Sequence, residues 1–419
     1  MGLTACTDGG FVGGSEDVNT IDAGTAASID ETIATALQLS QSTEAVVGIW
    51  TSSGEYVRGY GEGVSATTSI RAAQASQPVM CALLLDLAAD GTLALDRAVS
   101  EDLPRQVGLE GITYGDLCNA TSGLAEFKVA SLVDIFVNNP TRQWSDRELL
   151  AHALARSPLS EPGLEQHVSD TGSLLLARAL RQATGTSVNE LLNSRVFRAA
   201  EMNRSTYPAD VLAATELPDS MTALTYRYAN RAPICMVPGE EEGQEAPAEP
   251  RVVEAVAPSM LSGAGATVTT VTDLKRFYER YLAGGYGEEG GAGLITELWT
   301  APAPEPVEGE EAPAEGEGEG EPAEQPTSGW TFGLEKHDSL YGMSGAMTGT
   351  ITAAYHDPAS GFTVVVALNN SSAGASFVQT LAFQLAALSG ANVPWSAEDQ
   401  AAALSEKAIC QPPAEPASE

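Results

Sequence analysis

The sequence predicts an α/β fold of the α+β type: an antiparallel sheet built from both chain ends, flanked by helices, with an inserted mostly helical domain. Three observations predict it. A helix and a hairpin pattern occupy residues 26–60, helices and loops fill 112–215, and two strands followed by a helix occupy 348–388. Strand patterns at both ends, with helical patterns between them, indicate one sheet that is interrupted by a helical insertion.

The first elements follow from periodicity and turn signals. Residues 26–41 carry apolar side chains at helical spacing, and residues 77–90 form an apolar stretch that stops at Gly91. Segments 45–50 and 55–60 flank Ser52-Ser53-Gly54, which is typical of a β-hairpin. Further helices are expected over 146–155, 171–184 and 187–199.

The C-terminal part gives clearer signals. A helix is expected over 273–282. Segments 348–355 and 362–368 are predicted strands, joined by the tight turn 357–361. Residues 375–388 form an apolar helix that ends near Gly390.

Composition shifts divide the chain further. Glu, Pro, Gly and Ala at high density cannot bury enough surface to offset the entropy of ordering, so acidic tracts are expected to be mobile loops. The predicted divisions are a tether (1–24), a sheet domain (25–70 and 255–395), a helical domain (71–215), an irregular acidic segment (216–254), an acidic low-complexity loop (301–327) and a C-terminal tail (396–419).

The formal net charge is −35, and fourteen glutamates lie in the two tracts 238–250 and 301–326. Such a chain repels phosphate backbones, so we expect no nucleic-acid partner. No run of about 18 apolar residues is present, so no transmembrane span is expected.

The N-terminus resembles a lipoprotein signal. Leu3-Thr4-Ala5-Cys6 is similar to the lipobox of bacterial lipoproteins, in which the cysteine receives the lipid, and a Gly/Ser/Asp-rich stretch follows it. The resemblance implies a protein that is exported to the bacterial cell envelope and is either lipid-anchored through Cys6 or secreted. The alternative is an ordinary cysteine in a disordered tail.

Four other cysteines, Cys81, Cys118, Cys235 and Cys410, allow three disulfide pairings. Export favours disulfides over free thiols. Neither a CxxC pair nor Cys/His ligand spacing is present, and the four histidines are scattered, so neither a metal nor another cofactor is predicted.

Several phrases carry a resemblance to one enzyme family. They are 71–96 (RAAQASQPVMCALLLDLAADGTLALD), 112–124 (ITYGDLCNATSGL), 162–172 (PGLEQHVSDTG), 262–277 (SGAGATVTTVTDLKRF) and the strand Gly342-Met-Ser-Gly345. Over roughly residues 25–390, without the acidic tracts, the chain resembles the serine β-lactamase and D-alanyl-D-alanine carboxypeptidase family, in its class C and esterase-like branch. The resemblance implies a β-lactamase/transpeptidase-like fold.

The family's catalytic residues are replaced at all three motifs. Acyl transfer needs a serine with a lysine three residues later, and these positions hold Gln74 and Gln77. The YxN motif reads Val168-Ser169-Asp170, and the KTG or HSG motif reads Met343-Ser344-Gly345. None of the chain's four lysines has a serine three residues before it. The positions implied to form a vestigial cleft are Gln74, Gln77, Val168, Asp170, Met343, Ser344, Gly345 and Ala346.

Each replaced residue has an ordinary interpretation. Gln74 and Gln77 are expected to line a solvent-filled cleft, Val168 and Met343 to fill a pocket, and Ser76 to cap a helix. Asp170 has no partner lysine in the motif and is expected to be hydrogen-bonded, solvated or protonated, with a catalytic role as the alternative. The N–H groups of Gln74 and Ala346 are expected to keep part of an oxyanion hole.

The resemblance also implies a disulfide pairing. The segment with Cys118 is expected to pack beside the helix with Cys81, which pairs these two and leaves Cys235 with Cys410.

The functional hypothesis is a degenerate, non-catalytic member of the family whose cleft binds, senses or scaffolds. The resemblance implies a cell-wall stem peptide or another acyl-D-amino acid as ligand, and an envelope partner protein is an equal candidate. One alternative is an active serine hydrolase of β-lactamase, carboxypeptidase or esterase type that uses unrecognised residues. Another is an adhesive or spacer lipoprotein without a ligand.

Overall fold

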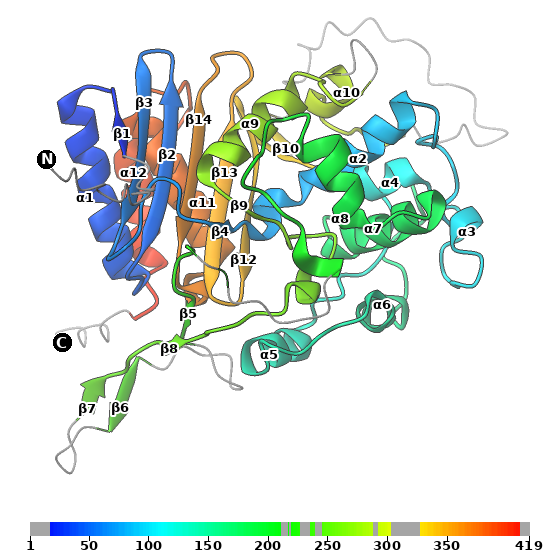
Figure 1. Ribbon diagram of the computed structural model, residues 1–419, viewed down its shortest axis with the longest axis horizontal. Coiled ribbons are helices and arrows are strands. Elements are labelled where there is room, and N and C mark those ends of the chain that lie inside the picture. The colour runs from blue at the N-terminus through cyan, green and yellow to red at the C-terminus, as the bar shows by residue number, and fades with distance from the viewer. Residues whose placement is uncertain are drawn as a thin grey trace, which may run out of the picture.

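The computed structural model describes residues 17–210, 217, 219–226, 235–238, 245–287, 292–302 and 327–410. Its centre is an antiparallel eight-stranded sheet, shown in Figure 1, with the order β1-β3-β2-β14-β13-β12-β11-β10. The strands are β1 (Val18–Asn19), β2 (Ala45–Thr51), β3 (Gly54–Tyr60), β10 (Ser328–Trp330), β11 (Glu335–His337), β12 (Leu340–Met347), β13 (Thr350–His356) and β14 (Thr363–Leu368).

The two ends of the chain meet in the middle of this sheet. Strand β14 pairs with β2 in the register Val366↔Val47 and with β13 in the register Val366↔Ala353. The runs Ala45–Ile49 and Thr363–Leu368 are fully buried, as expected for β-branched and small residues covered on both faces. The predicted sheet from both chain ends is therefore confirmed.

Helices cover both faces. On one face lie α1 (Ala23–Leu39), α11 (Ala375–Leu388) and α12 (Ala397–Glu406), which share one apolar cluster with the sheet. On the other face, α9 (Val271–Leu282) contacts β2, β13 and β14. The segment predicted as a tail thus includes α12, which packs against α11 and buries Leu404.

The helical region lies beyond the α9 face, on the right of Figure 1. It contains α2 (Pro78–Ala89), α3 (Val99–Asp102), α4 (Tyr114–Asn119), α5 (Ala130–Asn138), α6 (Asp146–Leu154), α7 (Asp170–Thr184) and α8 (Val188–Leu191). A π-helical turn, Leu192–Phe197, continues α8 within the predicted helix 187–199. The short helix α10 (Ala292–Thr296) contacts α9.

The described residues also form three small two-stranded sheets. They pair β4 (Ile70–Arg71) with β9 (Val268–Thr269), β5 (Leu224–Thr225) with β8 (Arg251–Val252), and β6 (Met236–Pro238) with β7 (Glu245–Pro247). The acidic segment 216–254, predicted as irregular, therefore holds four short strands among its described residues.

Both predicted disulfides are present. Cys81 of α2 bonds to Cys118 of α4 with a Cα–Cα distance of 5.8 Å, and Cys235 bonds to Cys410 with 5.6 Å. The first closes a loop inside the helical region. The second links the C-terminal segment to Cys235, the residue directly before β6.

Several predictions fall outside the described residues. These are lipidation of Cys6, most of the tether 1–24, and most of the acidic loop 301–327. The described end of the tether contributes β1, which pairs with β3. Among the helices that the structure describes, none combines the length and hydropathy needed to cross a membrane.

Candidate functional site

The turn that carries Gln74 is held in an uncommon backbone conformation. Residues Ala73–Ser76 form a 3₁₀ turn directly before α2, and Ala73 is buried with a φ of 45°. A positive φ at a non-glycine residue is strained and persists only where the surroundings impose it. The buried Tyr278 hydroxyl imposes part of it by donating a 2.8 Å hydrogen bond to the Ala75 carbonyl.

Ser76 does not cap α2. Its hydroxyl donates back to the Ala73 carbonyl at 3.0 Å, and the N-cap position is occupied by Gln77 without a side-chain cap bond. The prediction of a Ser76 cap is wrong, because the Ser76 hydroxyl is used for a hydrogen bond within the 3₁₀ turn that precedes α2.

The Gln74 side chain joins the sheet to the helical region. Its oxygen accepts a hydrogen bond from the Ala346 N–H at 3.0 Å, and its nitrogen donates to a carboxylate oxygen of Asp170 at 2.7 Å. The neighbouring Gly345 has no side chain to obstruct this approach: a Cβ there would lie 2.3 Å from the Gln74 side-chain oxygen. The predicted free N–H at Ala346 is therefore occupied by the chain's own amide.

Gln77 is buried one helical turn further on. Its nitrogen donates to the Ser173 hydroxyl of α7 at 2.6 Å, and its oxygen has no hydrogen-bond partner. Gln74 is 6% exposed and Gln77 is 4% exposed, so neither lines a solvent-filled cleft as predicted. Facing amides and hydroxyls, rather than water, satisfy most of their polar atoms.

Asp170 has an ionic partner, Lys128, that the motif comparison did not predict. It is the first residue of α7, and its carboxylate lies 2.5 Å from the Lys128 ammonium. Glu126 reaches the same place: one carboxylate oxygen accepts from the Asp170 N–H at 2.9 Å and the other accepts from the Lys128 N–H at 2.8 Å. Asp170 therefore pairs with the Lys128 ammonium, and Glu126 accepts from two backbone N–H groups beside this pair, at a helix N-terminus where the dipole also favours negative charge.

A threonine positions this group. The Thr171 hydroxyl donates to the Ala125 carbonyl at 2.7 Å and accepts from the Phe127 N–H at 2.9 Å. These bonds fix the loop between α4 and α5 against the start of α7, which brings Lys128 to Asp170. The only sequence signal was the scarcity of lysine, since this chain has just four.

Burial acts in opposite directions on the pKa values of Glu126 and Lys128. Burial, together with the Asp170 carboxylate, raises the pKa of Glu126 above its ordinary value, although Lys128 acts against it. Burial alone would lower the pKa of Lys128, but the carboxylates of Asp170 and Glu126 outweigh that effect and the pKa is raised. Lys128 is therefore charged at neutral pH, and the folded protein holds the proton of Glu126 more tightly than an exposed glutamate would.

The other predicted cleft residues divide into two groups. Gly345 lies against Gln74 as described, and Met343 is 3% exposed in the core between the sheet and the helical region. Ser344 is half-buried on the same strand. Val168 is 54% exposed, so the prediction that it fills a pocket is wrong: the loop before α7 turns this side chain toward solvent.

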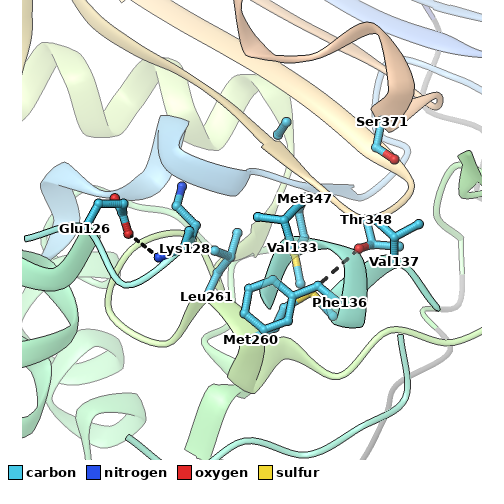
Figure 2. Close-up of a pocket in the computed structure, with 11 residues that line it drawn as sticks. Glu126, Lys128, Val133, Phe136, Val137, Met260, Leu261, Met347, Thr348 and Ser371 are labelled. Atoms are coloured by element: carbon cyan, nitrogen blue, oxygen red, sulfur yellow. Dashed lines mark hydrogen bonds between the residues drawn. The ribbon is translucent and has the colours of Figure 1, made fainter. Parts of the chain in front are cut away.

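A cavity of about 380 Å³ opens beside this hydrogen-bonded group. Figure 2 shows Glu126 and Lys128 at one end and an apolar wall made by α5 and the strand end at the other. The lining residues are Glu126, Lys128, Val133, Phe136, Val137, Met260, Leu261, Ala346, Met347, Thr348 and Ser371. The cavity is suited to a molecule with an apolar part, which would contact the wall, and a polar end, which would lie near Lys128 and Glu126.

Within the described ranges, no three His, Cys, Asp or Glu side chains are grouped to hold a metal ion. The carboxylates of Asp170 and Glu126 are instead engaged by Lys128 and backbone N–H groups.

Comparison with known proteins gives one family and many similar folds. The family model described as Beta-lactamase matches residues 29–388. A D-stereospecific amidohydrolase from Streptomyces sp. is similar in structure, with a TM-score of 0.66 and 19% identity over 84% of this chain and 97% of that one.

Two further structures have comparable similarity. An octameric penicillin-binding protein homologue from Pyrococcus abyssi gives a TM-score of 0.64 at 17% identity, covering 88% of this chain and 78% of that one. A D-amino acid amidase from Ochrobactrum anthropi gives 0.61 at 16% identity, covering 83% and 92%. At these identities the structural similarity establishes the fold alone.

Proposed function

This chain belongs to the beta-lactamase family, and we propose that it is a non-catalytic member that binds a ligand at the cell envelope. The observation that carries the proposal is the Gln74 side chain. It stands at the position where the family's motif has its nucleophile, and its amide oxygen accepts the Ala346 N–H that would otherwise receive a substrate carbonyl. A carboxamide is a poor nucleophile and no base at neutral pH.

The surroundings of Gln74 support the loss of acyl transfer. Gln77 stands at the motif's lysine position and binds Ser173. The Lys128 ammonium lies against Asp170 and has a raised pKa, so it is not a neutral base near pH 7. With nucleophile, base and oxyanion site altered together, a single surviving serine does not restore the reaction.

The cavity defines the ligand class within this proposal. Its wall at Val133, Phe136 and Leu261 is suited to an apolar side chain or acyl group. Near its polar end, the carboxylates of Asp170 and Glu126 outnumber the single Lys128 ammonium, so a carboxylate on the ligand would be repelled. We therefore propose a neutral or cationic ligand, such as an acyl-D-amino acid amide, a segment of a cell-wall peptide or a segment of an envelope protein.

The location is part of the same proposal. Two disulfides are typical of proteins that fold in oxidising compartments, which supports export. The lipobox-like Leu3–Cys6 supports a lipid anchor at Cys6. Radiolabelled palmitate incorporation in a bacterial host, compared between the natural chain and Cys6→Ser, tests the anchor.

Acylation is tested by intact mass spectrometry after incubation with penicillin G and with a fluorophosphonate. We expect no mass increase with either reagent. A stoichiometric adduct on any serine would contradict the proposal and would support an active hydrolase that uses residues other than Gln74.

Binding is tested by thermal shift and calorimetry with N-acyl-D-amino acid amides and the corresponding free acids. We expect the amides to bind more tightly than the acids. Val133→Asp, on the cavity wall, is expected to abolish binding, whereas Val107→Asp, which is 77% exposed and outside the cavity, is the matched control. If no amide binds, or if both variants behave alike, the ligand-binding part of the proposal is wrong and a spacer role is favoured.

A further inference from the structure

A second pair of cavities lies in the helical region, at the junction of α6 and α7. One has a volume of about 420 Å³ and the other about 590 Å³. Arg147 and Arg178 line both of them, so the two cavities adjoin each other. Neither includes any residue of the Gln74 site.

Arginines dominate the walls of these cavities. Arg178 and Arg181 project from one face of α7 at a spacing of three residues, Arg147 comes from the first turn of α6, and Arg105 comes from the loop after α3. This concentration is unusual in a chain with 56 acidic and only 21 basic residues. Four of the basic side chains meet at one surface.

Most of this positive charge has no carboxylate partner. Asp146 pairs with Arg181 at 2.7 Å, and Asp102 pairs with Arg97 at 2.8 Å. Among the described residues, Arg105, Arg147 and Arg178 form no ion pair within 4.0 Å. Burial lowers the pKa of Arg178, and the like charges of Arg147 and Arg181 add to this against the opposite effect of Asp146.

Two buried donors at the same cavities also lack an acceptor. The Arg178 Nε–H and the Trp144 indole N–H are both buried and form no hydrogen bond. Trp144 is 2% exposed and lines the smaller cavity with Arg178. A buried donor without an acceptor costs free energy. A ligand rich in hydrogen-bond acceptors would satisfy both of these donors.

We propose that this arginine cavity, lined by Arg105, Arg147, Arg178 and Arg181, is a binding site for a multiply charged phosphate-class anion. Guanidinium groups bind phosphate oxygens in pairs through parallel N–H groups, and several of them match an anion with three terminal oxygens better than a single carboxylate. A second phosphate group could occupy the adjoining cavity, so a pyrophosphate-type ligand matches the two cavities together.

Binding is measured by isothermal titration calorimetry with inorganic phosphate, pyrophosphate and citrate, in chloride buffers of matched ionic strength. We expect pyrophosphate to bind more tightly than phosphate, and both to bind more tightly than citrate. Absence of phosphate and pyrophosphate binding, or equal or tighter binding of citrate, would overturn the proposal.

Variants locate the site. Arg147→Gln removes an exposed side chain and Arg178→Gln a half-buried one, and each is expected to weaken pyrophosphate binding about tenfold or more. Arg198→Gln removes the same charge from an exposed position outside both cavities and is expected to leave binding nearly unchanged. If Arg147→Gln and Arg198→Gln weaken binding equally, the anion senses only overall charge and the site is refuted.

The two sites are separated by one more variant. Val133→Asp alters the cavity beside Lys128 but touches neither arginine-lined cavity. Pyrophosphate binding is expected to persist in this variant whether or not an acyl amide binds the natural chain. Loss of pyrophosphate binding in Val133→Asp would contradict a separate anion site.

Discussion

The side-chain oxygen of Gln74 lies 3.0 Å from the backbone nitrogen of Ala346, a residue 272 positions away in the sequence. The same amide donates to Asp170 at 2.7 Å, so one side chain connects the strand β12, the turn before α2 and the start of α7. The amide therefore satisfies a strand N–H and a buried carboxylate at once. Gln74 is therefore the centre of a closed, buried hydrogen-bonded junction between the sheet and the helical region.

Gly345→Ala tests how closely this junction is packed. The new methyl group would lie 2.3 Å from the backbone nitrogen of Gln74 and 2.3 Å from its side-chain oxygen, so the turn that carries Gln74 must move. We expect a loss of about 1–3 kcal/mol in the free energy of unfolding, measured by urea denaturation. Gly287→Ala is the control, because a Cβ there meets nothing within 4 Å. Equal stability of the two variants would show that the Gln74 turn is not tightly packed.

Lys128→Met tests the cation between the two carboxylates. Removing the ammonium leaves Asp170 and Glu126 buried with no opposing charge, so we expect a loss of about 2–3 kcal/mol in the free energy of unfolding at pH 8. The loss should shrink toward acidic pH, because Glu126, whose pKa is raised, takes up a proton. Lys336→Met, which removes an ammonium that lies over the Tyr341 ring, controls for lysine removal in general. A loss that does not change with pH would contradict the ionic role of Lys128.

Glu126→Gln tests the raised pKa of Glu126. Because the folded state holds this proton more tightly than the unfolded state, the carboxyl's contribution to stability is full below the unfolded pKa and is lost as pH rises through the folded pKa. The stability of the natural chain relative to Glu126→Gln should therefore fall as the pH rises above about 4.5. Denaturation curves at several pH values measure this difference. A difference that rises with pH would mean that the folded pKa is lowered.

The two disulfides should differ in their resistance to reduction. Cys81 and Cys118 are 3% and 1% exposed, whereas Cys235 and Cys410 are partly exposed. Thiol–disulfide exchange needs access to sulfur, so mild reductant is expected to open Cys235–Cys410 first. Alkylation followed by peptide mass spectrometry identifies the free thiols. Earlier labelling of Cys81 or Cys118 would contradict this order.

The sequence predicted the architecture because the strands β2, β13 and β14 carry strong apolar patterns with clear turns. It also identified Gln74, Asp170 and Ala346 as residues that belong to one place, through the resemblance in three separate phrases. It did not predict that the Gln74 amide would fill the site, because a rotamer depends on partners brought together only by folding. Lys128 and Glu126 were missed for the same reason, since they lie in a loop without a motif.

Val168 shows that a motif position does not fix the direction of a side chain. A resemblance assigns a residue to a motif position, but the direction of its side chain depends on the local backbone. Here Ser169 caps α7 by accepting from the Thr171 N–H, and the residue before it points to solvent.

The position of β14 between β2 and β13 has a consequence for synthesis. The partner of β2 on this side is residues 363–368, so a chain of the first 360 residues lacks the strand that β2 and β13 both pair with. Contacts between segments so far apart in the chain form late and slowly. The sheet therefore closes only when the chain is almost complete, and until then the edge of β2 that faces β14 is open to pairing with other chains.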